Sequence, residues 1–188
     1  MPLTDTAPRA LAAGTPPAGA AGTATLEAVL RDYGASLARL ARIYAPNPAD
    51  REDLLQEIAV ALLRALPGYR GESRLGTFVY RVALNRAITR RARQAPATLD
   101  LEAVAEPLDP SPGPEERQLA EERRGRLITA VRRLPAALGE VVALSLEGLS
   151  HGEIGEVLGI SENNVAVRAL RARALLREWL EEPHEHRR

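Results

Sequence analysis

A cluster of prolines inside this 188-residue chain divides it into two parts. Residues 94–114 contain Pro96, Pro107, Pro110, Pro112 and Pro114. Proline lacks the backbone donor that a helix needs and collides with the preceding turn, so no helix continues through this segment. On both sides of it, apolar residues recur at the three- and four-residue spacing of amphipathic helices, and no alternating strand pattern occurs. The sequence therefore predicts an all-α fold of two small helical domains joined by a flexible acidic linker.

The charges are sorted along the chain although they sum to zero. The chain has 25 basic residues, every one an Arg, and 25 acidic residues. Residues 31–93 carry twelve Arg against six acids, whereas residues 94–122 carry one Arg against eight acids. The neutral total argues against indiscriminate binding of polyanions. The local excesses predict a basic surface in the first half and an acidic linker after it.

Several classes of protein are disfavoured by what the sequence lacks. It contains no Cys, which removes disulfides, zinc–thiolate sites and thiol nucleophiles. No apolar run approaches the ~18 residues of a membrane span, and the N-terminus does not have the pattern of a secretory signal. We therefore expect a cytoplasmic protein without membrane contact. Residues 1–24 are expected to be a disordered N-terminal extension, and residues 183–188 a polar tail.

Three helices are predicted in the first half, over residues 25–44, 50–66 and 75–93. Asp50 is the expected N-cap of the second helix, after the break made by Pro46 and Pro48. The buried side of that helix is expected to consist of Leu54, Leu55, Ile58, Leu62 and Leu66. Another stripe is formed by Asp53, Glu57, Val60 and Arg64, with Gln56 beside it. On its own, an acidic stripe of this kind is typical of a solvated helix face.

The third predicted helix and the loop before it combine positive charge with aromatic rings. Residues 70–93 hold seven Arg, opposed only by Glu72, and the rings are those of Tyr69, Phe78 and Tyr80. Single-stranded nucleic acid is bound by such a combination, because charge attracts the backbone and rings stack on bases. Asn85 is placed to hydrogen-bond a base edge. The alternative is that one or both of Phe78 and Tyr80 belong to the core.

The end of the chain has the pattern of a helix-turn-helix. Ser150 and Glu153 form a capping box that begins a short helix, and Gly159 marks its end. Ser161 then caps a long last helix, so the order is helix, glycine-containing turn, helix. The expected inward side chains are Ile154, Leu158, Ile160, Val165, Ala169, Ala172 and Leu176.

The last helix leaves Arg and Asn side chains for a ligand. Asn163 and Asn164 lie at its N-terminus, which is the part that enters the major groove of DNA. Arg168, Arg171 and Arg173 occupy its remaining faces, within reach of phosphates and guanine edges. A helical hairpin with a solvated Arg face is the alternative interpretation.

Together these segments resemble a known family. Residues 50–57, 69–73 and 77–85 resemble region 2 of the extracytoplasmic-function (ECF) group of sigma factors of bacterial RNA polymerase. The second half resembles region 4 of this group at residues 134–135, 149–154, 158–161, 164–168 and 171–173. The resemblance implies the following division: sigma region 2 over 25–95, an acidic Pro-rich linker over 96–118, and sigma region 4 over 119–182.

The resemblance also implies a function and a set of partners. A protein of this group binds core RNA polymerase, recognises the minus-thirty-five and minus-ten elements of a promoter, and promotes DNA melting. The implied partners are the clamp helices of the largest polymerase subunit, the polymerase flap, promoter DNA and an anti-sigma factor. The acidic linker would either mimic RNA in the polymerase exit path or serve as a solvated tether.

Residue roles in region 2 follow from the same resemblance. Asp53, Gln56 and Glu57 match the patch that binds the clamp helices, and they are expected to be surface positions. Phe78 occupies the position of a frequent Trp at the step where the DNA strands part. The residues that match the capture of a flipped minus-ten base are Tyr69, Arg70, Gly71, Glu72 and Asn85.

In region 4, the resemblance places Arg168 and Arg171 at the minus-thirty-five element. The other residues expected at this DNA are Asn163, Asn164 and Val167. Three departures from the family pattern shift the expected base readout: Asn164 replaces a usual Thr, the pair Ala166-Val167 replaces a basic residue and Ser, and Leu170 replaces a bulkier or basic residue.

Two other functions remain open at this point. A dimeric helix-turn-helix regulator would bind duplex DNA without joining polymerase, but it leaves the region 2 motifs unexplained. An interaction protein with the same fold would titrate a partner instead of starting transcription.

We expect no metal, cofactor or enzymatic activity. Glu153 and Glu156 lie near His151, but the capping box already accounts for Glu153, and a zinc site needs more His or Cys. The pair His184 and His186 belongs to the polar tail. No nucleophile with a neighbouring base and no phosphate-binding loop is present in the sequence.

Overall fold

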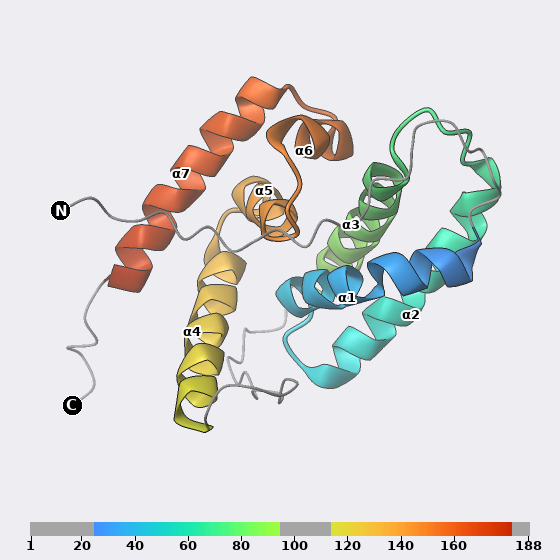
Figure 1. Ribbon diagram of the computed structural model, residues 1–188. Helices are drawn as coiled ribbons and strands as arrows, with labels where there is room; N and C mark the ends of the chain where they lie inside the picture. Colours follow the sequence, from blue (N-terminus) through green and yellow to red (C-terminus); the bar gives the residue numbers. More distant parts are fainter. Residues whose placement is uncertain (1–24, 95–113, 182–188) are drawn as a thin grey trace.

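The computed structural model describes residues 25–94 and 114–181, and its regular elements there are all helices (Figure 1). The first part contains α1 (Leu26–Tyr44), α2 (Pro48–Ala65), the 3₁₀ turn η1 (Leu66–Gly68) and α3 (Leu75–Gln94). The second part contains α4 (Pro114–Arg133), α5 (Ala136–Leu146), α6 (His151–Leu158) and α7 (Glu162–Glu181). The all-α prediction is confirmed for this part of the chain. Within it, no helix is long and apolar enough to cross a membrane.

Three sequence predictions concern residues outside these ranges. The N-terminal extension 1–24, the linker residues 96–113 and the tail 183–188 all lie outside the described residues. The last five residues of the predicted linker, 114–118, are instead the first residues of α4. Proline is favourable at the first helical position, where its missing N–H has no intrahelical partner anyway. Pro114 therefore begins a helix rather than preventing one.

The prediction that Asp50 caps the second helix is wrong. Asn47 is the N-cap, because its side-chain Oδ1 accepts a hydrogen bond of 2.7 Å from the backbone N–H of Asp50. The helix begins at Pro48, which has a suitable φ for the first helical position. Asp50 lies in the first turn, where a carboxylate interacts favourably with the helix dipole.

The first three helices pack around a common apolar core. The predicted stripe of α2 is buried at Leu54, Ile58, Leu62 and Leu66, while Leu55 is half-buried. It packs against α1 and α3, whose contributions include Leu37, Leu40, Val79 and Ala83. Burial of aliphatic side chains in this way is the main source of stability for a small helical bundle.

The helix-turn-helix prediction is confirmed by α6 and α7. Ser150 and Glu153 form the predicted capping box, and Gly159 ends α6 with a left-handed φ of 69°. Of the expected inward residues, Leu158 and Ile160 are half-buried and the others are buried. Gly155 also matters here, although the sequence analysis did not single it out. A Cβ at Gly155 would lie 2.7 Å from the carbonyl oxygen of Ile160, so the close turn needs glycine.

The two halves of the chain contact each other, with α3 lying against α2 and also against α6 (Figure 1). Tyr80 and Leu84 of α3 belong to the same apolar cluster as Val141, Leu144, Ile154 and Val157 of the second half. Arg132 of α4 donates hydrogen bonds to backbone carbonyls at the end of α1, including that of Ile43 at 3.2 Å. One helix, α3, therefore supplies side chains to two cores.

Candidate nucleic-acid interface

The acidic stripe of α2 is held by two arginines of α3. Arg86 donates to the carboxylate of Glu57 at 2.7 Å. Arg90 donates to Glu57 at 2.7 Å, to Asp50 at 2.8 Å and to Asp53 at 3.2 Å. The side chain of Asp53 is nevertheless 63% exposed, and Gln56 is exposed. Asp53 and Gln56 therefore face solvent as expected, whereas Glu57 is half-buried in ion pairs and is not the open surface position that the sequence suggested.

Arg90 is the centre of this network. Its side chain is only 14% exposed, and burial by itself would lower its pKa. The hydrogen bonds to Asp50, Asp53 and Glu57 outweigh that effect, so the pKa of Arg90 is raised. Its Nε is buried without a hydrogen-bond partner, and Nη1 and Nη2 make the bonds to the three carboxylates. This role was not predicted from the sequence, although the four-residue spacing of Arg86 and Arg90 matches that of Asp53 and Glu57.

The loop before α3 is exposed at its tip and anchored at its start. Arg70, Gly71 and Glu72 are exposed, and Gly71 has a φ of 76° that favours glycine. The hydroxyl of Tyr69 donates to the carbonyl oxygen of Ser73 at 2.6 Å. The rings of Tyr69 and Phe78 are 5.0 Å apart between centroids and tilted by 46°. The two predicted stacking rings therefore contact each other, and both are half-buried.

The remaining predicted minus-ten residue, Asn85, lies about two turns further along α3 and is exposed. It lines a shallow depression between α2 and α3 together with Ala61, Val82, Arg86 and Thr89. The structure thus brings the loop residues and Phe78 together at the start of α3, whereas Asn85 lies apart from them on the same helix. Tyr80 is buried, which confirms the core alternative for this ring.

Two arginines of this basic segment contact the second half. Arg74 pairs with Glu153 at 2.7 Å, and Arg81 donates to the backbone carbonyl of Glu156 at 2.6 Å. Both partners belong to α6, the first helix of the helix-turn-helix. Both arginines therefore make contacts within the protein in this arrangement, although their side chains remain exposed.

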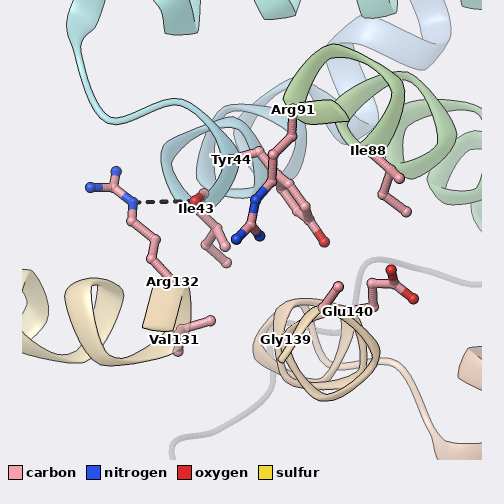
Figure 2. A pocket seen from close by; sticks show the side chains of 9 residues that line it. Ile43, Tyr44, Ile88, Arg91, Val131, Arg132, Gly139 and Glu140 are labelled. Carbon is pink, nitrogen blue, oxygen red and sulfur yellow. Dashed lines mark hydrogen bonds between the residues drawn. The ribbon is translucent and has the colours of Figure 1, made fainter. Parts of the chain in front are cut away.

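A small pocket lies where the halves meet, and Figure 2 shows Tyr44 and Arg91 on one side of it and Glu140 on the other. Burial raises the pKa of the Tyr44 hydroxyl. Burial also raises the pKa of the Glu140 carboxyl, against the opposing effect of Arg168 and Arg91. No group of three or more metal-ligating side chains occurs among the described residues. The pocket therefore belongs to the contact between the halves.

The predicted minus-thirty-five residues lie together on the first turns of α7. Asn163, Asn164, Val167 and Arg171 are exposed, on the side opposite the buried stripe of this helix. Arg168 is half-buried, and its Nε donates to the side-chain oxygen of Asn164 at 2.9 Å. Leu170 was not among the residues predicted at this site, yet its side chain is 69% exposed on the same outward side.

Comparison with known proteins divides the chain into two matched regions. Residues 29–96 match the family described as Sigma-70 region 2, and residues 124–176 match Sigma-70, region 4. The ECF RNA polymerase sigma-E factor of Escherichia coli (strain K12) is 32% identical over 152 residues, covering 75% of this chain and 78% of that protein. RNA polymerase sigma factor NccH of Alcaligenes xylosoxydans xylosoxydans is 31% identical over 159 residues, covering 81% and 85%.

Solved structures share the fold at lower identity. CnrH, in complex with the cytosolic domain of CnrY, has a TM-score of 0.62 and 24% identity, covering 83% of this chain and 87% of CnrH. The sigma factor RpoE, in complex with the anti-sigma factor NepR from Bartonella quintana, has a TM-score of 0.64 and 18% identity, covering 82% and 96%. From the two regions in order and from its relatives, this chain belongs to the ECF group of the sigma-70 family of RNA polymerase sigma factors.

Proposed function

We propose that this chain is the promoter-specificity subunit of an RNA polymerase holoenzyme. In this role it binds core polymerase, recognises the minus-thirty-five and minus-ten elements, and promotes melting. The observation that carries the proposal is that one chain contains both sigma regions in order, each with an exposed polar surface opposite its core. It acts in the cytoplasm and catalyses no reaction of its own.

Core binding is assigned to α2. Asp53 and Gln56 are exposed there, and Arg90 holds the carboxylates of the stripe in fixed positions. A preorganised acidic surface loses little side-chain entropy when it meets a basic partner, which supports an interface with the clamp helices. The second half is assigned to the polymerase flap.

Promoter recognition is assigned to two surfaces. The loop 69–73, Phe78 and Asn85 serve the minus-ten strand, and the residues Asn163, Asn164, Val167, Arg168 and Arg171 serve the minus-thirty-five duplex. The exposure of the loop tip and of Asn85, and the outward position of the α7 residues, support this assignment. The domain division that we propose is region 2 over 25–95, a linker from residue 96 to the start of α4 at Pro114, and region 4 up to residue 182.

Because α3 contacts α6, the two proposed DNA surfaces are held close together. We call this arrangement the closed form. The names of the two promoter elements place them about 25 base pairs apart, which is roughly 85 Å along B-DNA at 3.4 Å per pair. Helices that pack side by side have axes about 10 Å apart. Both surfaces therefore engage a promoter only after α6 leaves α3. CnrH and RpoE were solved with CnrY and with the anti-sigma factor NepR, and we propose an anti-sigma partner for this chain as well.

Reconstitution with core polymerase and a promoter library tests the function. A sigma factor gives core-dependent initiation and permanganate-reactive, melted DNA near the start site. A duplex-binding regulator gives sequence-specific binding without core and no melted DNA. A titrating partner binds core but does not start transcription.

A further inference from the structure

The outward face of α7 is unexpectedly apolar at its middle. Val167 is 40% exposed and Leu170 is 69% exposed, which is the largest value for a bulky apolar side chain in the described residues. At 100° per residue these two positions point away from the buried Val165, Ala169 and Ala172. Neither side chain belongs to any of the three apolar clusters found in residues 25–94 and 114–181.

Positive charge lies on both flanks of this apolar pair. By the same helical rotation, Arg168 and Arg173 lie on opposite sides of the line through Val167 and Leu170, and Arg171 lies beside it. Asn164 accepts a hydrogen bond of 2.9 Å from Arg168, which fixes the direction of that guanidinium. Cations on both flanks match the two phosphate backbones that border a groove of DNA.

An apolar centre between cationic flanks selects among bases. In the major groove, thymine alone presents a methyl group, and an aliphatic side chain gains free energy by covering it. Single exposed apolar residues need no explanation on a protein surface. Two branched aliphatic residues at i and i+3, on the outermost line of the helix that follows the turn, are a different case. An apolar surface without cations on both sides would instead favour binding of a protein partner.

We propose that Val167 and Leu170 read thymine methyl groups in the major groove of the minus-thirty-five element, and that Leu170 makes the larger contribution. This inference rests on the proposed function, because it requires that α7 lies in that groove. We therefore expect the minus-thirty-five element to contain one or more thymines opposite the middle of α7. Arg168 and Arg173 hold the flanking phosphates, and Arg171 remains available for a polar base edge.

The test uses holoenzyme assembled from core polymerase and the full chain. The preferred minus-thirty-five sequence is first selected from a random library. Each thymine in it is then replaced by deoxyuridine, which removes the methyl group and leaves the base-pairing groups unchanged. Affinities are compared for wild type, Leu170→Ala and Val167→Ala. Leu180→Ala is the matched control, because Leu180 is an exposed leucine near the far end of the same helix.

The expected result is a loss of about fourfold for wild type at one thymine, the factor expected for one methyl-sized apolar group. Leu170→Ala binds thymine DNA several-fold more weakly than wild type and no longer distinguishes thymine from deoxyuridine there. Leu180→Ala keeps the wild-type difference. Arg173→Ala weakens binding to both DNAs equally and keeps the methyl preference.

Three results overturn the inference. If deoxyuridine has no effect at any thymine, or if Leu170→Ala keeps the full effect, α7 does not read methyl groups through this pair. If Leu170→Ala weakens core binding while its DNA preference stays unchanged, the apolar face is a protein contact. In all three cases the holoenzyme still prefers the selected element to a scrambled one. Failure of the proposed function is distinct, because then no minus-thirty-five preference appears at all.

Discussion

The guanidinium of Arg39 in α1 forms an ion pair with the carboxylate of Glu147, just after α5. This ion pair joins the two halves of the chain. Nε of Arg39 donates to both carboxylate oxygens, at 3.1 and 3.2 Å, and Nη2 donates to one of them at 2.7 Å. The side chain of Glu147 is 2% exposed, whereas that of Arg39 is 44% exposed. The carboxylate is therefore buried with the arginine as its cationic partner at the junction.

Arg39→Ala should weaken the contact between the halves. It leaves the carboxylate of Glu147 buried without this cation, and loss of a charged hydrogen-bond partner costs about 1.5–3 kcal/mol. Urea unfolding should show a loss in this range, and a fluorophore pair placed on α1 and α5 should move apart. Glu181→Gln is the control, because its 3.9 Å pair with Arg177 is exposed and should matter by less than about 0.5 kcal/mol. Equal stability of the two variants would contradict the prediction.

Asp53→Arg should abolish core binding with little effect on folding. Asp53 is the most exposed of the three carboxylates that Arg90 contacts, so its replacement should change the free energy of unfolding by under ~1 kcal/mol. Co-purification with core polymerase and urea unfolding measure the two effects. Glu57→Arg is expected to lose both binding and stability, since Arg86 and Arg90 lose their common partner. Wild-type recovery of a folded Asp53→Arg variant with core would reject the clamp assignment.

Asn85→Ala should impair promoter melting more than recruitment. Asn85 is exposed and its replacement leaves the core intact. Contacts to an unpaired base form only after the strands separate, so loss of the Asn85 amide should affect the melted complex and not the closed one. Permanganate reactivity should fall while closed-complex affinity stays unchanged.

Tyr69→Phe provides a second measurement of the same surface. It removes the hydrogen bond to Ser73 but keeps the ring against Phe78. Melting should fall less than in Tyr69→Ala. If Asn85→Ala or Tyr69→Ala instead reduces closed-complex affinity and leaves permanganate reactivity normal, these residues do not act in melting.

Arg171→Ala should cost about 1–3 kcal/mol on the preferred minus-thirty-five sequence and flatten the preference at one position. Arg171 is exposed on the outward side of α7, and a guanidinium there can contact a guanine edge when the helix lies in the major groove. Arg173→Ala, on the flank, should weaken all sequences alike and reduce the salt slope by about one. Binding of single-base variants at two salt concentrations separates the two behaviours. A uniform loss for Arg171→Ala would assign it to phosphate instead.

The stability of the α6 cap should depend on acid pH. The backbone N–H of Ser150 lowers the pKa of the Glu153 carboxyl, and the Ser150 hydroxyl and Arg74 add to this against the effect of burial. A lowered folded-state pKa gives stability that is fully present above the unfolded value of about 4.3 and is lost as pH falls through the folded value. The free energy of unfolding of wild type should therefore fall more between about pH 5 and pH 3 than that of Glu153→Gln. Glu156→Gln, an exposed change on the same helix, should keep the wild-type decrease.

Local rules were enough to predict most helices and the outward face of α7. The capping box at Ser150, the left-handed Gly159 and the buried stripe of α7 each depend on residues within one or two turns. A local signal can also mislead: Asp50 has a side chain suited to capping, but the N-cap is Asn47. The reason is Pro48, which favours the first helical position and so begins the helix earlier.

Contacts between distant residues were not predicted from the sequence. Arg39 and Glu147 are 108 positions apart, and neither belongs to a motif. The pairing of Arg90 with the acidic stripe of α2 depends on how α2 and α3 pack, which periodicity does not specify. The sequence therefore predicted which side chains the candidate surfaces contain, but not which of them are already engaged within the protein.

Because α3 contributes side chains to two apolar clusters, the equilibrium of the proposed opening should depend on temperature. Tyr80 and Leu84 pass from an apolar cluster into water when α6 leaves α3. Exposure of apolar surface raises the heat capacity, and apolar contacts weaken on cooling. Through this contribution, the open form gains population as the temperature falls. Access to the promoter then varies with temperature through two side chains that lie in an apolar cluster and not in the proposed DNA surfaces.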